Sequence, residues 1–335
     1  MRIAVDAMGG DFAPREIVAG AVQAARGLPL VSKVYLVGRE SDVTAELKRH
    51  GAVPSNLEVR HAAETVGMDE SPALAVRKKK DSSIGRAVDM VKAGEADAVV
   101  SAGNTGAVVV AATLKLRALD GVERPAIATV LPTQGRPLVL IDAGANTDCA
   151  ANLLVQFAVM GSIYSREILG VANPSVGLLS IGEEDSKGNE ITKEAFRLLS
   201  GTKLNFRGNV EGHDLFEGET DVIVCDGFVG NVVLKTSESV AHAIGQWLKQ
   251  EFTRNIVRKV GALLLRNALC AMKKRMDPEL YGGAPLLGVN GVCIITHGAS
   301  SATAIYHAIR VACDSIGHQI NHQIVDDIKN VGKAT

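Results

Sequence analysis

The apolar residues of this chain gather in short, continuous runs rather than at alternating positions. Continuous runs of Val, Ile, Leu and Ala are typical of strands that are covered on both faces. The candidate strands are Ile3–Val5, Val34–Val37, Ala98–Val100, Ala126–Val130, Leu138–Ile141, Val176–Leu179, Val222–Val224 and Val292–Ile295. Between them lie amphipathic segments with helical spacing, such as Glu16–Arg26, Ala150–Ser165 and Ser301–Ser315. This alternation predicts an α/β fold of three layers, αβα, with a doubly wound and mostly parallel sheet.

The same pattern bears on domain organisation. No Pro-, Gly- or Ser-rich linker and no internal repeat divides the chain, so we predict one α/β unit over residues 1–335, with interleaved subdomains that share one sheet. The alternation stops after Asn231, and residues 232–276 have a helical pattern throughout. Because this stretch is too long for one crossover between strands, we expect it to form a helical hairpin that projects from the body.

The composition narrows the class of protein. The 335 residues are 47% hydrophobic and 22% charged, which is typical of a globular chain with a large core. Aromatic residues make up only 4%, so the core must be aliphatic. A formal net charge of -1 argues against nucleic acid as a partner, because phosphate backbones require clustered excess cations.

Cysteine usage and the apolar runs indicate a location. The five cysteines are dispersed, with no C-x-x-C pair and no metal-binding spacing, which favours a reducing cytoplasm. The chain opens on the strand-like Arg2–Asp6, so we expect no signal peptide. No apolar run approaches the length of about 20 residues that spans a bilayer.

Six polar, glycine-rich turns are the candidate site. They are Asp6–Asp11, Ser101–Gly106, Asp142–Asn146, Ser180–Gly188, Asp226–Asn231 and His297–Ser301. Ligands of open α/β sheets bind at the carboxyl ends of strands, where we expect these turns to meet. Glycine lets the backbone approach an anion, and a helix start offers unpaired N–H groups. One such turn more often serves only the backbone, but six together favour an anion site.

The turns match no standard nucleotide or hydrolase motif. The chain has no G-x-x-x-x-G-K-[ST], no G-x-G-x-x-G after a strand and no G-x-S-x-G, so we predict no nucleotide cofactor. Lys187 is either an anion contact or a solvated loop lysine. Asp6, Asp142 and Asp226 either cap helices or ligate a metal, and their spacing does not decide between these roles.

Five segments carry a resemblance to a known family. They are Ala4–Asp11, Ser101–Gly106, Lys187–Asn189, Cys225–Val232 and Gly291–Gly298. On these segments, which run in order along nearly the whole chain, it resembles the PlsX family, the phosphate acyltransferases of bacterial phospholipid synthesis. The resemblance implies a homodimer whose fold is like that of the isocitrate and isopropylmalate dehydrogenases and of phosphotransacetylase.

The resemblance also implies a reaction: a long-chain acyl group passes from acyl carrier protein to inorganic phosphate. The acyl phosphate would serve phosphatidic acid synthesis and be consumed by a membrane acyltransferase, and no metal or cofactor is expected. The family places a lysine and an asparagine in the active site, and the matching residues are Lys187 and Asn231. We expect phosphate to be bound by Asp6, Gly9, Gly10, Gly103, Asn104, Thr105, Gly106, Asp226, Gly230 and His297.

The expected hairpin is basic at its far part. From Phe252 to Met276 there are seven Lys or Arg and no Asp or Glu. At helical spacing, one set of apolar residues falls opposite Arg254, Arg258, Lys259 and Arg266. That apolar set is Ile256, Val257, Val260, Leu263 and Leu264. The helix is either a dimer interface with a solvated basic side, or a surface that adsorbs to anionic lipid through Val260, Leu263 and Leu264.

Other interpretations stay open at this point. A second basic run, Lys78–Lys80, is either solvated or a docking point for an acidic partner. The alternative functions are a short-chain phosphotransacylase, a metal- and NAD-dependent decarboxylating dehydrogenase, and a membrane-adsorbed scaffold that sequesters acyl carrier protein. The sequence does not reveal the acyl-chain preference or the general acid for the leaving thiol. If the membrane interpretation holds, the protein is cytoplasmic and peripheral to the inner face of the cell membrane.

Overall fold

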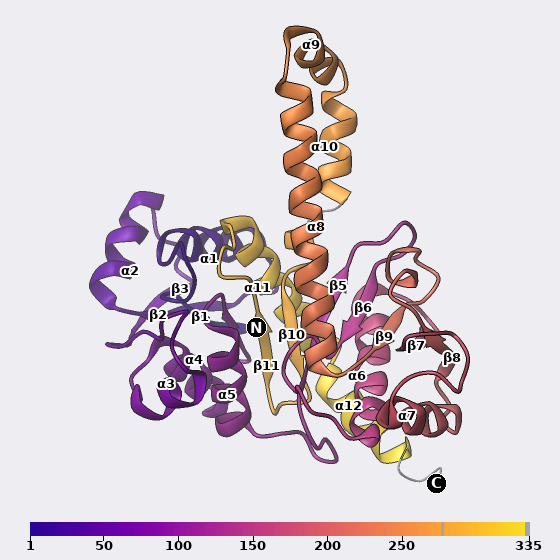
Figure 1. Ribbon diagram of the computed structural model, residues 1–335. Coiled ribbons are helices and arrows are strands. Elements are labelled where there is room, and N and C mark those ends of the chain that lie inside the picture. The colour runs from indigo at the N-terminus through magenta and orange to yellow at the C-terminus, as the bar shows by residue number, and fades with distance from the viewer. Residues whose placement is uncertain (276–277, 332–335) are drawn as a thin grey trace.

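The computed structural model describes residues 1–275 and 278–331. These residues form one 11-stranded sheet in the order β3-β2-β1-β4-β11-β10-β5-β6-β9-β7-β8. The strands are β1 (Arg2–Asp6), β2 (Lys33–Gly38), β3 (Leu57–His61), β4 (Ala98–Ser101), β5 (Ala126–Leu131), β6 (Leu138–Ile141), β7 (Ser175–Leu179), β8 (Asn205–Val210), β9 (Val222–Val224), β10 (Ala284–Leu287) and β11 (Val292–Ile295). Helices flank the sheet (Figure 1), so the predicted α/β fold is confirmed.

The helices fill the connections between the strands. They are α1 (Arg15–Gly27), α2 (Glu40–Leu47), α3 (Pro72–Lys78), α4 (Ser83–Lys92), α5 (Thr105–Leu116), α6 (Ala151–Leu169), α7 (Glu190–Ser200), α8 (Gly227–Thr253), α9 (Ile256–Leu264), α10 (Arg266–Arg275), α11 (Ala302–Gly317) and α12 (Ile320–Val331). Short 3-10 turns lie at η1 (Lys48–His50), η2 (Asp214–Phe216) and η3 (Pro278–Tyr281).

The sheet is mostly parallel, as predicted, but its direction reverses in the middle. Seven neighbouring pairs are parallel. The three central pairs, β11–β10, β10–β5 and β5–β6, are antiparallel. Three successive reversals leave β1, β4 and β11 running opposite to β6, β9 and β7. We call the edge where β1, β4 and β11 end the first edge, and the edge where β6, β9 and β7 end the second edge.

The core consists of aliphatic layers on both faces of the sheet. In β1, Ile3 and Val5 pack with helices α1 and α11, whereas Ala4 packs on the other face with α4 and α5. In the other half, Val139 of β6 packs with α6, and Leu140 lies on the face that the base of α8 covers. Successive strand residues point to opposite faces, so a strand buried on both sides needs an unbroken apolar run.

The hairpin rises from the first edge of the sheet (Figure 1). Helix α8 starts after β9 at the second edge, crosses one face and leaves the body, and α10 returns toward β10, whose first residue pairs with the end of β11. The hairpin predicted for residues 232–276 corresponds to these helices, although α8 already begins at Gly227, and Met276 lies outside the described residues. None of the described helices combines the length and apolar character needed to cross a membrane.

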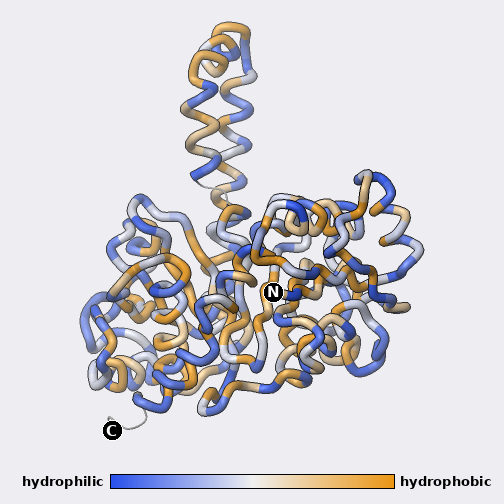
Figure 2. Tube along the Cα trace, turned by 180° about the vertical axis from the view of Figure 1, so that it is seen from behind, coloured by the Kyte–Doolittle hydropathy of each residue, from blue (hydrophilic) through white to orange (hydrophobic). Residues whose placement is uncertain are grey.

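Two apolar surfaces of the hairpin face solvent in the single chain. Along α8, Val240, Ile244 and Trp247 recur at helical spacing and are 52%, 40% and 64% exposed. At the tip, where Figure 2 shows apolar residues gathered, α9 exposes its apolar residues widely. Leu263 is 68% exposed and Leu264 is 82% exposed. Large apolar side chains left in water over a contiguous area mark interaction surfaces.

Candidate active site

The predicted site residues lie at two opposite edges of the sheet. At the first edge are Asp6, Gly9, Gly10, Gly103, Asn104, Thr105, Gly106 and His297, which follow β1, β4 and β11. At the second edge are Lys187, Asp226, Gly230 and Asn231, which follow β7 and β9. The prediction that all six turns meet was wrong, because the three antiparallel pairs reverse the strands between the two sets.

A buried carboxyl group organises the first edge. Asp6 is 2% exposed, and its Oδ2 accepts a hydrogen bond from Ser101 Oγ at 2.7 Å. Ser101 Oγ in turn accepts from Gly103 N at 3.1 Å, and Asp6 Oδ1 accepts from Met8 N at 3.3 Å. Burial raises the pKa of Asp6, and the hydrogen bonds from Ser83 and Ser101 oppose that shift. The Asp6 carboxyl group therefore ties the turns after β1 and β4 together from inside.

Glycine is required where the three first-edge turns touch. A Cβ atom on Gly9 would lie 2.6 Å from Asp6 Oδ2 and 2.7 Å from Gly103 N. Gly10 has a φ of +100°, and a Cβ there would lie 2.8 Å from Gly298 O. His297, in the third turn, is exposed, and its Nδ1 accepts from Ala299 N at 3.1 Å. The residues predicted for these three turns are thus brought together.

The start of α5 lies at the centre of this edge. Asn104 caps the helix, since its Oδ1 accepts from Ala107 N at 3.0 Å. Its Nδ2 donates to the carbonyl oxygens of Gly67, Met68 and Glu70 at 3.3, 2.8 and 3.1 Å. The Asn104 side chain is therefore occupied in holding residues 67–70 over the helix start. Thr105 and Gly106 begin the helix, where backbone N–H groups have no intrahelical partner and the dipole favours an anion.

A second buried carboxyl group organises the second edge. Asp142 is fully buried, and its Oδ1 accepts from the backbone N–H groups of Ile127, Gly144 and Ala145 at 3.0, 3.1 and 3.0 Å. Its Oδ2 accepts from Asn146 N at 2.7 Å and Asn146 Nδ2 at 2.9 Å. Burial raises the pKa of Asp142, and these donors act in the opposite direction. Asp142 is therefore the centre of its own turn.

Helix α8 begins in direct contact with that turn. Asp226 caps the helix, with Oδ1 accepting from Val229 N at 2.8 Å. Gly230 lies so close that a Cβ atom on it would be 1.9 Å from the carbonyl oxygen of Asp142. The next residue, Asn231, is exposed, and its Cβ lies 3.6 Å from where a Cβ on Gly144 would be. The packing thus presents the Asn231 amide to solvent beside the turn of Asp142.

Lys187 is exposed on the neighbouring loop of the same edge. The strands that precede these two residues, β7 and β9, are adjacent in the sheet. The loop is fixed by Lys187 N donating to Glu184 O at 3.0 Å and by Asn209 Nδ2 donating to the same oxygen at 2.8 Å. Within the described residues, Lys187 has no ion pair with an acidic side chain. Its ammonium group is available to an anion that approaches this edge.

The described residues offer little support for catalysis by a cysteine nucleophile or by a bound metal ion. Cys149, Cys225, Cys293 and Cys313 are buried, and burial raises the pKa of Cys293 to about 12 and that of Cys149 and Cys313 to about 11. The fifth cysteine, Cys270, is exposed on α10. Among the described residues, no group of three or more His, Cys, Asp and Glu is placed to hold a metal ion.

Comparison with known proteins gives one consistent family. The family model described as "Fatty acid synthesis protein" matches residues 1–323. The phosphate acyltransferase of Pelotomaculum thermopropionicum is 50% identical over 331 residues, covering 99% of this chain and 96% of the relative. The phosphate acyltransferase of Heliobacterium modesticaldum is 53% identical over 313 residues, covering 93% of each chain.

Solved structures share the fold at low sequence identity. A phosphotransacetylase from Streptococcus pyogenes has a TM-score of 0.61 and 19% identity, covering 95% of this chain and 94% of that one. A branched-chain phosphotransacylase from Enterococcus faecalis has a TM-score of 0.54 and 14% identity, covering 94% of this chain and 99% of that one. At these identities the likeness concerns the architecture of the sheet and its helices.

The contact between Gly230 and Asp142 gives a prediction about stability. Gly230→Ala should destabilise the protein by roughly 1–3 kcal/mol, because the added methyl group must displace a backbone carbonyl. Gly245→Ala, in the same helix, is the control, since nothing lies within 4 Å of a Cβ there. This change should stabilise by up to about 1 kcal/mol, because alanine favours helix over glycine. Urea unfolding curves of the two variants measure both effects, and equal midpoints would contradict the predicted contact.

Proposed function

The chain belongs to the phosphate acyltransferase family, and on that premise we propose that it transfers a long-chain fatty acyl group from acyl carrier protein to inorganic phosphate. Identity of 50% over nearly the full length of a named phosphate acyltransferase carries this proposal. The product would be an acyl phosphate for phosphatidic acid synthesis, consumed by a membrane acyltransferase. The proposed reaction requires no cofactor.

The proposed reaction needs no side chain as a nucleophile. Phosphate is already an anionic oxygen nucleophile at neutral pH, so the thioester can be attacked without a covalent enzyme intermediate. The protein must hold phosphate against the carbonyl carbon and stabilise the oxyanion that forms. We propose that the start of α5 and the Gly9–Gly10 turn bind phosphate, that Lys187 balances its charge, and that the Asn231 amide donates to the oxyanion.

These roles require groups from both edges of the sheet, which one chain keeps apart. We propose that the protein is a homodimer in which the first edge of one copy meets the second edge of its partner. The exposed stripe of Val240, Ile244 and Trp247 on α8 supports association, because three large apolar side chains in water favour burial against a second copy.

The tip of the hairpin supports a peripheral position on the inner face of the cell membrane. Its exposed residues Val260, Leu263 and Leu264 would enter the lipid surface, with cations toward the anionic headgroups. Arg258 contacts Glu251, and Arg254 lies 3.6 Å from the same carboxylate, so part of the positive charge is already balanced. Lys259 and Arg266 are therefore the cations that we expect to contribute most to adsorption.

The proposed activity has a direct test. The purified protein, inorganic phosphate and long-chain acyl carrier protein should yield acyl phosphate and free carrier protein, measured by mass spectrometry. Omitting phosphate should stop the reaction, and a chelator should not. Turnover of short-chain thioesters alone would instead identify a short-chain phosphotransacylase, and NADH formation from 2-hydroxy acids would identify a dehydrogenase. Binding of acyl carrier protein without product would identify a scaffold.

The two catalytic candidates should differ in their kinetics. Lys187→Ala should mainly raise KM for phosphate, because it removes a charge that faces an anion. Asn231→Ala should lower kcat by about 100-fold or more, the usual cost of losing one oxyanion donor. Steady-state kinetics with phosphate varied measure both effects. A variant with unchanged constants would remove its residue from the proposed site.

Mixed dimers test whether the site is shared. Gly9→Ala disturbs only the first edge and Asn231→Ala only the second, and each homodimer should be nearly inactive. If copies share sites, random mixing should restore about a quarter of wild-type activity, because half of the dimers are hybrids with one intact site. Unfolding, mixing and refolding the two variants provides the hybrids. No recovery, with dimers confirmed by light scattering, would place the site within one chain.

A double substitution distinguishes a membrane-binding role of α9 from a role as a dimer interface. Changing both Leu263 and Leu264 to Glu should abolish sedimentation with anionic liposomes while leaving a folded dimer that is active on acyl carrier protein. Each fully buried leucine contributes about 1.5–3 kcal/mol, and the new charges are repelled by anionic lipid. The control changes Leu30 and Leu114, which are 55% and 68% exposed on the body, to Glu. A tip variant that loses the dimer would assign α9 to a protein interface instead.

A further inference from the structure

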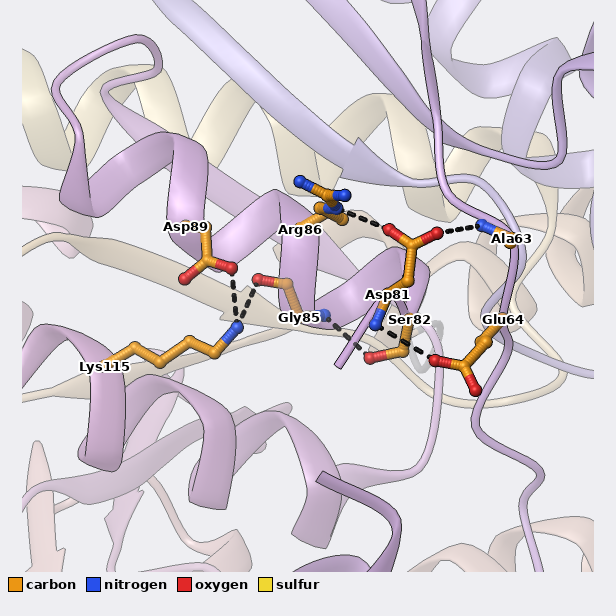
Figure 3. Close-up of polar contacts among 8 residues, drawn as sticks. All are labelled: Ala63, Glu64, Asp81, Ser82, Gly85, Arg86, Asp89 and Lys115. Carbon is orange, nitrogen blue, oxygen red and sulfur yellow. Dashed lines mark hydrogen bonds and ion pairs between the residues drawn. The ribbon is translucent and has the colours of Figure 1, made fainter. Parts of the chain in front are cut away.

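Residues 62–82, which we call the strap, form a fixed surface beside the first edge. Figure 3 shows how its two ends are joined: Asp81 Oδ2 accepts from Ala63 N at 3.0 Å, and Asp81 N donates to Glu64 Oε2 at 3.0 Å. Arg86 Nε donates to the other oxygen of Asp81 at 2.5 Å. The middle of the strap is held by Asn104, as described above. The strap is therefore anchored to the helix start that we assign to phosphate.

Ion pairs and hydrogen bonds engage most of the acidic residues of the strap and one of its cations. Lys79 Nζ donates to Thr65 O at 2.7 Å and to Glu70 Oε1 at 2.5 Å. The bonds from Lys79 and Arg86 lower the pKa of Glu70 and Asp81 respectively, so these carboxylates stay ionised and paired. Three of the four acidic residues of the strap are thereby engaged, and only Asp69 is exposed without a hydrogen bond or ion pair in the described residues.

Three other cations of the strap are exposed. Arg77, Lys78 and Lys80 are exposed, and in the part of the chain that the structure describes none of them has an ion pair or a side-chain hydrogen bond. They stand at the end of α3 and directly after it, on both sides of the paired Lys79. Cations that have no partner within the fold attract an acidic partner from solution, with a strength that depends on salt.

Apolar side chains lie between these cations and the first edge. Leu74, one turn before Lys78 on α3, is 54% exposed. Met68, in the middle of the strap, is 43% exposed, and its Cε is 2.9 Å from where a Cβ on Gly298 would lie. The strap therefore presents apolar residues next to the site turns and a group of cations farther along the same segment.

We propose that the strap is the docking surface for the acyl carrier protein, with Arg77, Lys78 and Lys80 contacting its acidic face and Met68 and Leu74 contacting apolar residues beside its thioester arm. This inference rests on the proposed function. Carrier proteins are small and acidic, so their charge complements an unpaired basic group, and complementary charges mainly speed and orient association. The cations around α9 lie at the far tip of the hairpin (Figure 1), away from the turns that an arm must reach.

The test compares a carrier-bound substrate with a small one. The variant changes Arg77, Lys78 and Lys80 to Ala, and the matched control changes Lys48, Lys203 and Arg207, which are also exposed. For long-chain acyl carrier protein, the strap variant should raise KM by roughly tenfold, with kcat unchanged, because rim charges act on association. For the same acyl chain on N-acetylcysteamine, which has no acidic face, KM and kcat should stay within about twofold. Added salt should raise the wild-type KM for the carrier substrate toward that of the variant.

Each other outcome has a defined meaning. An unchanged KM for the carrier substrate, or equal losses with both thioesters, would overturn the docking proposal. The same loss in the control variant would also overturn it, since the effect would then come from net charge. If wild type turns over the small thioester but not the carrier substrate, the proposed acyl donor fails and the docking proposal fails with it. If the small thioester is not a substrate, fluorescence anisotropy of labelled carrier protein should show a roughly tenfold weaker Kd for the strap variant alone, and equal Kd values would overturn the proposal.

Discussion

The reversal of strand direction at the centre of the sheet is the constraint on which the rest of the molecule depends. The single strand β10 is antiparallel to both of its neighbours, and β5 and β6 add one more reversal. As a result, the carboxyl ends of the two halves lie at opposite edges, and each half carries its own set of polar, glycine-rich turns. The reversal also decides where the hairpin leaves the body, since α10 must return to the start of β10. A sheet with all strands parallel would have gathered the turns at one edge.

In each half of the molecule, a buried carboxyl group holds the turns at the strand ends in place. Asp6 is the last residue of β1 and Asp142 directly follows β6. Both are buried, and both accept hydrogen bonds from the turn that follows. Burying a carboxyl group is costly unless donors surround it, and here the donors are backbone N–H groups together with the side chains of Ser101 and Asn146. The glycines are fixed by the same arrangement, because Gly9 and Gly230 press against the two carboxyl-bearing residues. The polar groups that look like ligand contacts in the sequence are therefore largely the framework that shapes the site.

The sequence predicted the interior of the fold better than its margins. All eight predicted strands exist, because strands covered on both faces must be continuous apolar runs. Three strands were missed for physical reasons. β3 and β8 are the two edge strands of the sheet and carry polar residues such as Glu58 and Arg207, and β10 contains Pro285. Missing β10 had the largest effect, since it starts the reversal that separates the two sets of turns. Local pattern gives the place and type of an element, but strand direction depends on long-range pairing, which a single sequence does not display.

The distribution of charge shows why composition alone could not assign a role to the basic residues. The net charge of -1 is an average over a chain in which acids and bases are sorted by their contacts. In the run 77–80, Lys79 pairs with Glu70, whereas Arg77, Lys78 and Lys80 have no ion pair within the described residues. Near the hairpin tip, Glu251 forms ion pairs with Arg254 and Arg258. These arginines are therefore partly neutralised, although the sequence from Phe252 to Met276 contains no acidic residue. Only the fold reveals which cations have no partner among the described residues, and in the strap these are Arg77, Lys78 and Lys80, at and after the end of α3. Under the docking proposal, these cations would guide an acidic carrier, while the start of α5 would bind phosphate.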